Sequence, residues 1–312
     1  MTRAFVFPGQ GAQTIGMGRD LADAYPAARA VFEEVDAALG EKLSDLIWSG
    51  EAETLTLTAN AQPALMATSI AALRALEAEG ITVEGHAAYV AGHSLGEYSA
   101  LVAAGSLSLS DAARLLRIRG EAMQSAVPVG VGAMAALLGL GFEDAQAVAE
   151  EAAGDEICQA ANDNDPSQVV VSGHKAAVER ALDIAKAKGA KRAMLLPVSA
   201  PFHCDLMEPA AAAMARALDD VAIAAPSVPL VANVTARPVT DPDVIRSLLV
   251  DQVTGSVRWR ESVGEMANLG VTEIWEIGAG KALSGMIRRI DKSVATRAVG
   301  TPADVNAAKD AL

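Results

Sequence analysis

Cysteine is the rarest residue in this 312-residue sequence, occurring only as Cys158 and Cys204. Two thiols are too few for a disulfide scaffold or for a tetrahedral thiolate metal site, so we expect a reducing compartment. Positive charge is also scarce, because 25 Lys and Arg stand against 39 Asp and Glu, which gives a formal net charge of −14. A nucleic-acid-binding protein needs a basic surface, so the composition argues against nucleic acid as a partner.

Long apolar segments are missing as well. The first apolar run, residues 4–7, ends at Pro8 and is much shorter than the hydrophobic region of a secretory signal. The stretch 64–76 contains Ser, Thr and Arg, so it does not supply the roughly 20 uninterrupted apolar residues of a membrane helix. We therefore expect a cytoplasmic protein without a membrane partner. Hydrophobic residues still make up 51% of the chain, enough for a sizeable core in one or two domains.

Short apolar runs alternate with longer segments of helical period, which is the pattern of an α/β protein. The first half predicts strands at 4–7 and 87–91, a helix at 64–79, and a helix at 111–126 with Ser110 as its N-cap. The same alternation returns after residue 197. There we expect helices at 205–218, 244–252 and 261–269 and strands at 230–234 and 272–277.

Residues 128–197 follow a different order, which is strand, helix, strand, strand, helix, strand, as in a ferredoxin-like unit. The expected strands are 134–138, 157–161, 169–172 and 193–196, the helices 143–153 and 176–188, and a turn covers 162–166. We predict a discontinuous α/β-hydrolase-like large domain, residues 1–127 and 198–312, with a ferredoxin-like small domain, residues 128–197, inserted into it. The cleft between them is the expected site.

Gly92-His93-Ser94-Leu95-Gly96 lies between a predicted strand and a predicted helix, which is the setting of a nucleophile elbow. Its two glycines allow the sharp turn that presents the Oγ of Ser94, although an ordinary glycine-rich turn is the alternative. The backbone N–H of Leu95 can then serve as an oxyanion donor. The Gly9-Gln10-Gly11 turn lacks the third glycine of a dinucleotide fingerprint, so we read Gln10 as the place for another such donor.

A serine nucleophile needs a base, and the chain has four histidines. His93 adjoins Ser94 and should point away from its Oγ. His86 lies in a loop before a strand, and His174 opens a helix of the small domain. His203 comes just after the last strand of the small domain, where the chain returns to the cleft, so elimination favours His203 as the base over a structural histidine.

Several motifs, in this order along the whole chain, resemble those of the malonyl-CoA:acyl carrier protein transacylase family of type II fatty acid synthesis. They are Phe7-Pro8-Gly9-Gln10-Gly11-Ala12-Gln13, Gly92-His93-Ser94-Leu95-Gly96-Glu97, Arg119-Gly120, Asn162-Asp163-Asn164, His203, and Gln252 ahead of Val257-Arg258-Trp259. The resemblance implies that Ser94 carries a malonyl group from malonyl-CoA to the phosphopantetheine thiol of acyl carrier protein by a ping-pong route. No cofactor and no metal are expected, and we expect a monomer.

The resemblance also assigns roles to residues of this chain. It implies that His203 acts as base and then as acid, held by the backbone carbonyl of Gln252, and that the N–H groups of Gln10 and Leu95 form the oxyanion hole. The residues implied for the substrate are Arg119, which clamps the malonyl carboxylate, Asn162 and Gln252.

Two further features depend on the surroundings of that site. Phe202, just before His203, resembles the aromatic residue of malonyl-selective members and should crowd an α-methyl branch. Arg114 and Arg117 are expected on a solvated face of the helix that carries Arg119.

Coenzyme A and carrier proteins are anionic, as this chain is, so a local basic patch must overcome the net charge. We expect Lys191, Arg192 and Arg288 to form the docking surface. The wider set of candidates also includes Lys186, Lys188, Arg258, Arg260, Arg289 and Lys292.

Two other functions stay open. One is a serine thioesterase or carboxylesterase, because the same elbow and base would serve hydrolysis. The other is a non-catalytic subunit that docks the carrier protein. The complete set of Ser94, His203 and Arg119 argues against the docking subunit. Arg119 also argues against an esterase, because a neutral substrate would leave a buried guanidinium unpaired.

Overall fold

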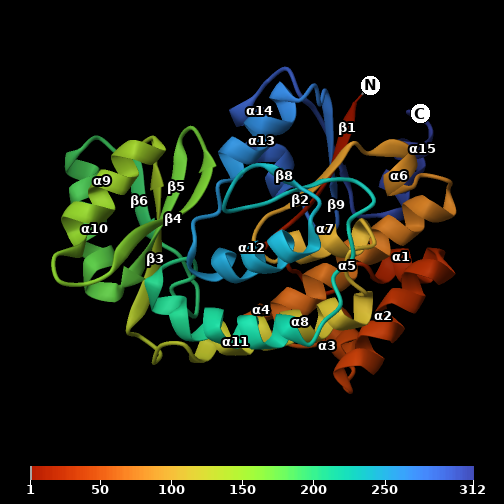
Figure 1. Cartoon of the computed structure of the whole chain (residues 1–312), viewed down its shortest axis with the longest axis horizontal. Coiled ribbons are helices and arrows are strands. Elements are labelled where there is room, and N and C mark those ends of the chain that lie inside the picture. The colour runs from red at the N-terminus through yellow and green to blue at the C-terminus, as the bar shows by residue number, and fades with distance from the viewer. Residues whose placement is uncertain (1) are drawn as a thin grey trace.

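The computed structural model describes residues 2–312, which form two separate sheets surrounded by helices (Figure 1). The larger sheet has six strands in the order β10-β9-β1-β2-β7-β8. Its neighbours are parallel except for the antiparallel pair β7 and β8. The strands are β1 (Arg3–Phe7), β2 (Tyr89–Gly92), β7 (Leu230–Val231), β8 (Pro238–Val239), β9 (Glu273–Ile277) and β10 (Ala295–Val299).

The smaller sheet is antiparallel and has the order β4-β5-β3-β6. Its elements are β3 (Gly132–Leu138), α9 (Phe142–Ala153), β4 (Cys158–Asp165), β5 (Gln168–His174), α10 (Lys175–Ala187) and β6 (Arg192–Leu195). The two helices pack on the sheet around a hydrophobic cluster of their own, which includes Leu137, Val148 and Val178. Figure 1 shows this group of elements at the left, beside the rest of the chain.

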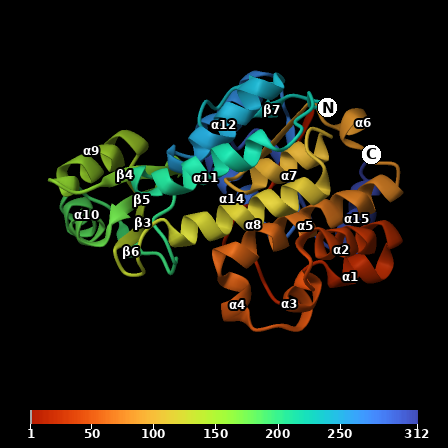
Figure 2. The same cartoon turned by 60° about the horizontal axis from the view of Figure 1, so that its bottom comes forward.

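Helices pack around the larger sheet. Among residues 2–312, no helix is both long enough and apolar enough to cross a membrane. Helix α8 lies along α5 and α11 (Figure 2). The helices are α1 (Arg19–Ala24), α2 (Pro26–Leu39), α3 (Leu43–Ser49), α4 (Ala52–Thr56), α5 (Thr58–Ala78), α6 (Val83–His86), α7 (Gly96–Ala103), α8 (Leu109–Ser125), the 3-10 turn η1 (Asp205–Met207), α11 (Glu208–Asp219), α12 (Pro242–Thr254), α13 (Trp259–Asn268), α14 (Ala282–Ile290) and α15 (Pro302–Lys309).

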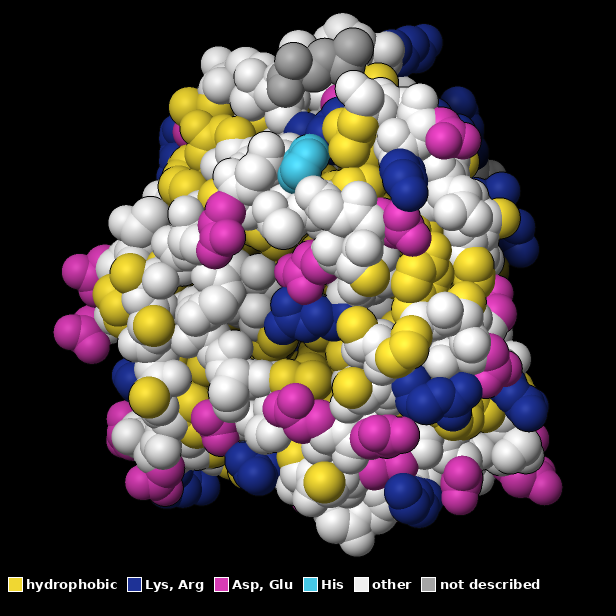
Figure 3. Space-filling model, turned by 90° about the vertical axis from the view of Figure 1, so that its right-hand side faces the viewer, with side chains coloured by type: hydrophobic (Ala, Val, Ile, Leu, Met, Phe, Trp, Pro, Cys, Tyr) yellow, Lys and Arg dark blue, Asp and Glu magenta, His cyan; other side chains and the backbone are white. Residues whose placement is uncertain are grey.

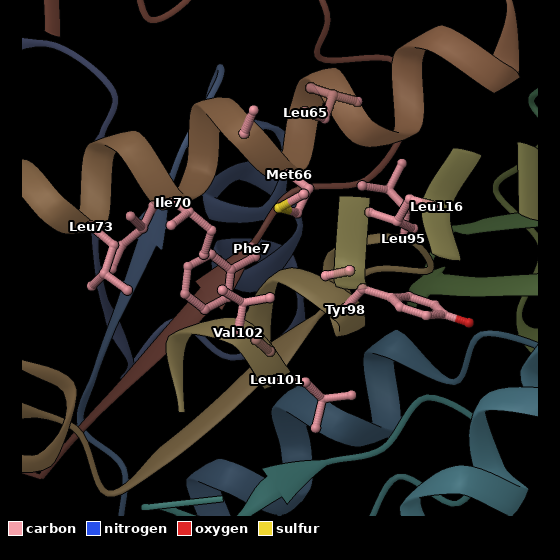
Figure 4. Packing of buried hydrophobic residues seen from close by; sticks show 14 of the residues in the cluster. Phe7, Leu65, Met66, Ile70, Leu73, Leu95, Tyr98, Leu101, Val102 and Leu116 are labelled. Atoms are coloured by element: carbon pink, nitrogen blue, oxygen red, sulfur yellow. The ribbon is translucent and has the colours of Figure 1, made fainter. Parts of the chain in front are cut away.

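The core between the larger sheet and its helices is built around α5, which is buried along most of its length. Met66 and Ile70 of this helix lie over Phe7 of β1 and beside Val102 of α7 (Figure 4). Complete burial of side chains of this size stabilises the fold by about 1.5–3 kcal/mol each. This packing fixes the ends of β1 and β2, from which the residues of the site emerge.

The expected alternation of strands and helices is present, but the segment 162–166 is not the turn that we predicted. Residues up to Asp165 continue strand β4, with register irregularities near Asn162 and Asp165. The carboxylates of Asp163 and Asp165 are fully buried and pair with Arg260 and Arg289, both at 2.7 Å. These distant partners stabilise acidic residues in a strand that would otherwise be unfavourable there.

Three other expectations need correction. Helix α8 is capped by Ser108, whose Oγ accepts the N–H of Asp111 at 3.0 Å, and not by Ser110. Ser110 instead donates its hydroxyl to Glu34 at 2.8 Å. The strand expected at 230–234 has only two residues, and the helix expected at 64–79 already begins at Thr58. Residues 19–56, to which the sequence patterns assign no element, form α1 to α4.

Candidate active site

Ser94 lies between β2 and α7, at the carboxyl end of the larger sheet. Its φ is 54°, in the left-handed region that is unfavourable for a residue with a side chain. The turn requires glycine on both sides. A Cβ on Gly92 would lie 1.9 Å from the carbonyl oxygen of Gly96, and a Cβ on Gly96 would lie 2.3 Å from that of Phe7. The two glycines therefore allow the close contacts that force Ser94 to point away from the sheet.

Asn233 holds this turn from the next strand, although the sequence analysis gave it no role. Its Oδ1 accepts the backbone N–H of Ser94 at 2.8 Å, and its Nδ2 donates to the carbonyl of Gly92 at 2.7 Å. Asn233 is buried and comes just after β7, the neighbour of β2. The sequence signal for this role is that Asn233 is a polar residue within the strand expected at 230–234, whose carboxyl end lies at the same edge of the sheet as that of β2.

His203 is the histidine that the fold brings to Ser94. Its Nε2 lies 2.8 Å from the Oγ of Ser94, and its Nδ1 donates to the carbonyl oxygens of Gln252 at 2.9 Å and Gly255 at 3.2 Å. These acceptors assign the proton to Nδ1 and leave the lone pair of Nε2 facing the hydroxyl. Burial, with the nearby charge of Arg119, lowers the pKa of His203 to about 3. The imidazole is therefore neutral near pH 7, as a general base must be.

The other histidines have different partners. The Nε2 of His93 lies 2.8 Å from the Oδ1 of Asn164, although the residue adjoins Ser94. The Nδ1 of His174 accepts the N–H of Ile157 at 3.0 Å, in the smaller sheet, and His86 contacts the backbone of Thr82. The contact with Asn164 agrees with the expectation that His93 points away from the Oγ of Ser94.

Arg119 of α8 is almost completely buried, with 1% of its surface exposed. One terminal nitrogen donates to the Oε1 of Gln62 at 2.7 Å, and the other to the Oε1 of Gln252 at 2.8 Å and the Oγ of Ser94 at 3.1 Å. Among residues 2–312, no carboxylate forms an ion pair with it, and its Nε has no acceptor. A buried guanidinium beside the nucleophile, without an acid in contact, suits a substrate that brings its own carboxylate.

The two other arginines of this helix lie outside the site. Arg114 pairs with Asp111 at 3.0 Å, and Arg117 donates to Asn60 and pairs with Glu41. Their ion pairs are more exposed than Arg119, as expected for a solvated face.

Gln252 of α12 connects the base to the arginine. Its backbone carbonyl accepts from His203, while its side-chain oxygen accepts from Arg119. Its Nε2 donates to the Oε2 of Glu97 at 2.7 Å and to the carbonyl of Ser94 at 3.0 Å. Glu97 is buried, which raises its pKa to about 7. In the sequence, Glu97 is marked only by its place in the motif that contains Ser94, and no role was predicted for it.

A cavity of about 510 Å³ lies at these residues, and its wall includes strands of the smaller sheet and the turns that follow β1 and β2 of the larger one. In the described part of the chain, the backbone N–H groups of Gln10 and Leu95 have no hydrogen-bond acceptor, and both residues line this cavity. The side chain of Gln10 instead accepts from Thr58 at 3.0 Å. Asn162 and Phe202 also line the wall. Every residue expected at the serine or the acyl group therefore lies at or beside this cavity. Gln252 does not line the cavity itself, but it contacts His203 and Arg119, which do.

A second cavity, of about 740 Å³, lies between residues 14–20 and the turn 278–281. It contains neither Ser94 nor His203, so we place the chemistry in the smaller cavity. Across residues 2–312, no three His, Cys, Asp or Glu side chains are grouped as metal ligands.

The basic residues expected to dock a carrier protein fall into two groups. Five form ion pairs with acids of this chain; they are Lys186, Lys188, Arg258, Arg260 and Arg289. The other four, Lys191, Arg192, Arg288 and Lys292, make no ion pair within residues 2–312, although Arg288 donates to Thr296 at 2.9 Å. On the side of the molecule opposite the smaller sheet, acidic and basic side chains are interspersed, without a large region of one sign (Figure 3).

Comparison with known proteins identifies the family of this chain. The model of the acyl transferase domain matches residues 4–296. The malonyl CoA-acyl carrier protein transacylase of Bacillus subtilis is 47% identical over 310 residues, which are 99% of this chain and 96% of that protein.

Solved structures agree with this relationship. The crystal structure of acyl-carrier-protein-S-malonyltransferase from Bartonella henselae is 57% identical and has a TM-score of 0.97, covering 100% of this chain and 99% of that one. A malonyl-transacylase in complex with a type II PKS acyl-carrier protein is 42% identical, with a TM-score of 0.97 and complete coverage of both chains.

Proposed function

The chain belongs to the acyl transferase domain family, and we propose that it transfers a malonyl group from malonyl-CoA to acyl carrier protein, as the malonyl CoA-acyl carrier protein transacylases of that family do. The enzyme is thus a malonyl-CoA:acyl carrier protein S-malonyltransferase. One observation carries the choice of acyl group, which is the buried guanidinium of Arg119 at 3.1 Å from the Oγ of Ser94, with no acid in direct contact among residues 2–312. A malonyl thioester brings the missing carboxylate to that position.

The first half of the proposed reaction forms an acyl-enzyme. The Oγ of Ser94 attacks the thioester carbonyl carbon while its proton passes to the Nε2 of His203. The N–H groups of Gln10 and Leu95 donate to the oxyanion of the tetrahedral intermediate. When the carbon–sulfur bond breaks, the leaving thiolate takes the proton from His203 and departs as coenzyme A.

The second half repeats these steps with a different thiol. The phosphopantetheine thiol of acyl carrier protein gives its proton to His203 as its sulfur attacks the malonyl ester. Collapse of the intermediate breaks the bond to Ser94, and the serine oxygen recovers the proton from His203. The backbone carbonyls of Gln252 and Gly255 hold the imidazolium in both halves, in the position that a carboxylate occupies in many serine hydrolases.

The remaining site residues complete the proposal. Asn162 borders the acyl group, and Phe202 leaves too little room for an α-methyl branch. Both line the cavity. Lys191, Arg192 and Arg288 provide the docking charge for coenzyme A and carrier protein, since they are not neutralised by an acid of this chain.

We also propose a division into two domains, with residues 1–127 and 198–312 as an α/β-hydrolase-like domain and residues 128–197 as a ferredoxin-like one. The strand order β4-β5-β3-β6, with one helix in each crossover, supports the second name. The serine elbow at the end of a parallel strand supports the first. All proposed catalytic groups come from one chain, which supports a monomer, and the free thiols of Cys158 and Cys204 support a cytoplasmic location.

Transfer of a labelled group tests the proposed function. The protein is mixed with radiolabelled malonyl-CoA, isolated, and then given carrier protein with or without its phosphopantetheine. We expect label on the protein first and on the phosphopantetheine-bearing carrier only. Release of free malonate at the same rate with and without carrier would instead identify a thioesterase, and absence of any labelled protein would favour a docking subunit.

A further inference from the structure

Glu97 is the buried acid that faces the active-site arginine. Among residues 2–312 the other buried carboxylates have partners elsewhere: Asp36 accepts from Ser44, Asp163 and Asp165 from Arg260 and Arg289, and Glu276 from the first amides of α14. Glu97 accepts from the Nε2 of Gln252 at 2.7 Å and from the backbone N–H of Asn233 at 3.3 Å. No cation contacts it directly.

The side-chain amide of Gln252 stands between two opposite charges. Its oxygen faces the donating guanidinium of Arg119 at 2.8 Å, and its nitrogen faces the accepting carboxylate of Glu97 at 2.7 Å. The reverse orientation would place the amide N–H groups against the guanidinium and the amide oxygen against the carboxylate. Glu97 and Arg119 therefore fix one orientation of Gln252, the residue whose backbone carbonyl holds His203.

We propose that Glu97 is the resident counter-charge of Arg119, acting through Gln252, and that its negative charge limits how strongly the site prefers acyl groups that carry a carboxylate. The inference rests on the proposed function. A direct ion pair would occupy the donors of Arg119 and compete with the substrate. The amide keeps Glu97 away from the guanidinium. Above pH 7, where a carboxyl group with a pKa of about 7 is ionised, the negative charge of Glu97 still acts on Arg119.

The charge of Glu97 should affect the transfer of malonyl and of acetyl groups unequally. Proton transfer from Ser94 creates an imidazolium at His203, close to the positive charge of Arg119. When malonyl-CoA is bound, the carboxylate of the substrate compensates for that charge. When acetyl-CoA is bound, Glu97 is the buried anion left to do so. Removing the charge of Glu97 should therefore slow acetyl transfer more than malonyl transfer, and the loss of repulsion between two anions should lower the KM for malonyl-CoA.

The variant Glu97→Gln tests this because it keeps the shape of the side chain and an oxygen that can accept from Gln252. The matched control is Asp36→Asn, which removes a buried carboxylate far from the cavity. Single-turnover acylation and steady-state kcat/KM are measured with malonyl-CoA and with acetyl-CoA. We expect the malonyl-to-acetyl ratio of kcat/KM to rise at least about fivefold in Glu97→Gln and to stay unchanged in Asp36→Asn. If both substrates slow by one factor, Glu97 is merely structural and the proposal is overturned.

Two further variants keep the proposal testable if Glu97→Gln folds poorly. Glu97→Asp retains the charge, so its substrate ratio should equal that of the wild type even if both rates fall. In an Arg119→Ala background, Glu97→Gln should no longer alter the ratio, and a persistent effect would show that Glu97 does not act through Arg119. Wild-type protein is assayed first, because its failure to transfer malonyl to carrier would refute the proposed function and not this role of Glu97.

Discussion

Ser94 and His203, whose side chains meet at 2.8 Å, both have left-handed backbone conformations, with φ values of 54° and 60°. Within the described chain, Ala236 is the other non-glycine residue with positive φ. Such a conformation costs on the order of 1–3 kcal/mol per residue, and it persists only where the surrounding contacts impose it. The protein therefore gives up stability at the two positions where a hydroxyl and an imidazole must meet.

Removal of the serine hydroxyl should abolish the covalent intermediate. Ser94→Ala should show no added malonyl mass after mixing with malonyl-CoA, whereas wild type and the exposed control Ser293→Ala should both show it by intact-protein mass spectrometry. An adduct that persists in Ser94→Ala would assign the nucleophile to another residue.

The backbone strain at Ser94 predicts an unusual order of stabilities. Glycine adopts positive φ without a steric penalty, so Ser94→Gly should be more stable than Ser94→Ala by about 1 kcal/mol, although glycine usually destabilises a chain. Urea unfolding of the two inactive variants measures the difference. Equal stabilities, or a more stable alanine variant, would mean that the turn relaxes and stores no strain.

Loss of the base should slow transfer far more than loss of the neighbouring histidine. His203→Ala should lower kcat by at least roughly 100-fold, the usual contribution of general acid–base catalysis. His93→Ala should do much less, because its Nε2 faces Asn164 and not the Oγ of Ser94. Initial rates of malonyl transfer decide the matter, and a larger loss in His93→Ala would contradict the assignment.

Arg119 should determine which acyl group is used. In Arg119→Ala the malonyl carboxylate loses its partner, so kcat/KM for malonyl-CoA should fall by at least about 100-fold. The value for acetyl-CoA should fall little or rise. Arg117→Ala is the control on the same helix, because Arg117 binds Asn60 and Glu41 at the surface. A uniform loss for both substrates in Arg119→Ala would make Arg119 a structural residue.

The buried state of His203 predicts how stability changes with pH. Its pKa is lowered to about 3 in the folded protein, whereas an unfolded chain protonates histidine near 6.5. Below pH 6.5 the unfolded state therefore binds one more proton at this position, and His203 makes the protein less stable as the pH falls. The free energy of unfolding of wild type relative to His203→Ala should decrease between pH 7 and pH 5, as measured by urea unfolding at each pH. A constant difference would mean that the pKa of His203 in the folded protein equals that in the unfolded chain.

Sequence alone predicts a structural feature when residues close together in the chain determine its geometry. The glycines around Ser94 predict the turn because the close contact between Gly92 and Gly96 involves residues only four positions apart. His203 followed from elimination together with its place after the smaller sheet. The contact of His203 with the carbonyl of Gln252 came only from the resemblance, because any residue offers a carbonyl and no side-chain pattern marks it.

The parts that sequence reasoning missed depend on distant partners. Asn233 contacts Ser94 across 139 residues, and Glu97 contacts Gln252 across 155. The run from Asn162 to Asp165 has the composition of a turn, yet arginines 97 and 124 positions further along hold it as a strand. No local pattern shows which far segment will supply such a partner.

The attachment of strand β4 to the segment around Val257 has a consequence for turnover. Backbone hydrogen bonds join Asp163 to Val257 and Val257 to Ala161, each at 2.9 Å, beside the ion pairs of Asp163 and Asp165. The smaller sheet therefore cannot swing about its two connecting chains without breaking these bonds and leaving two buried carboxylates unpaired. We therefore expect the width of the opening above Ser94 to change little when a thioester binds, so that the size of the acyl group is tested as it enters the cavity.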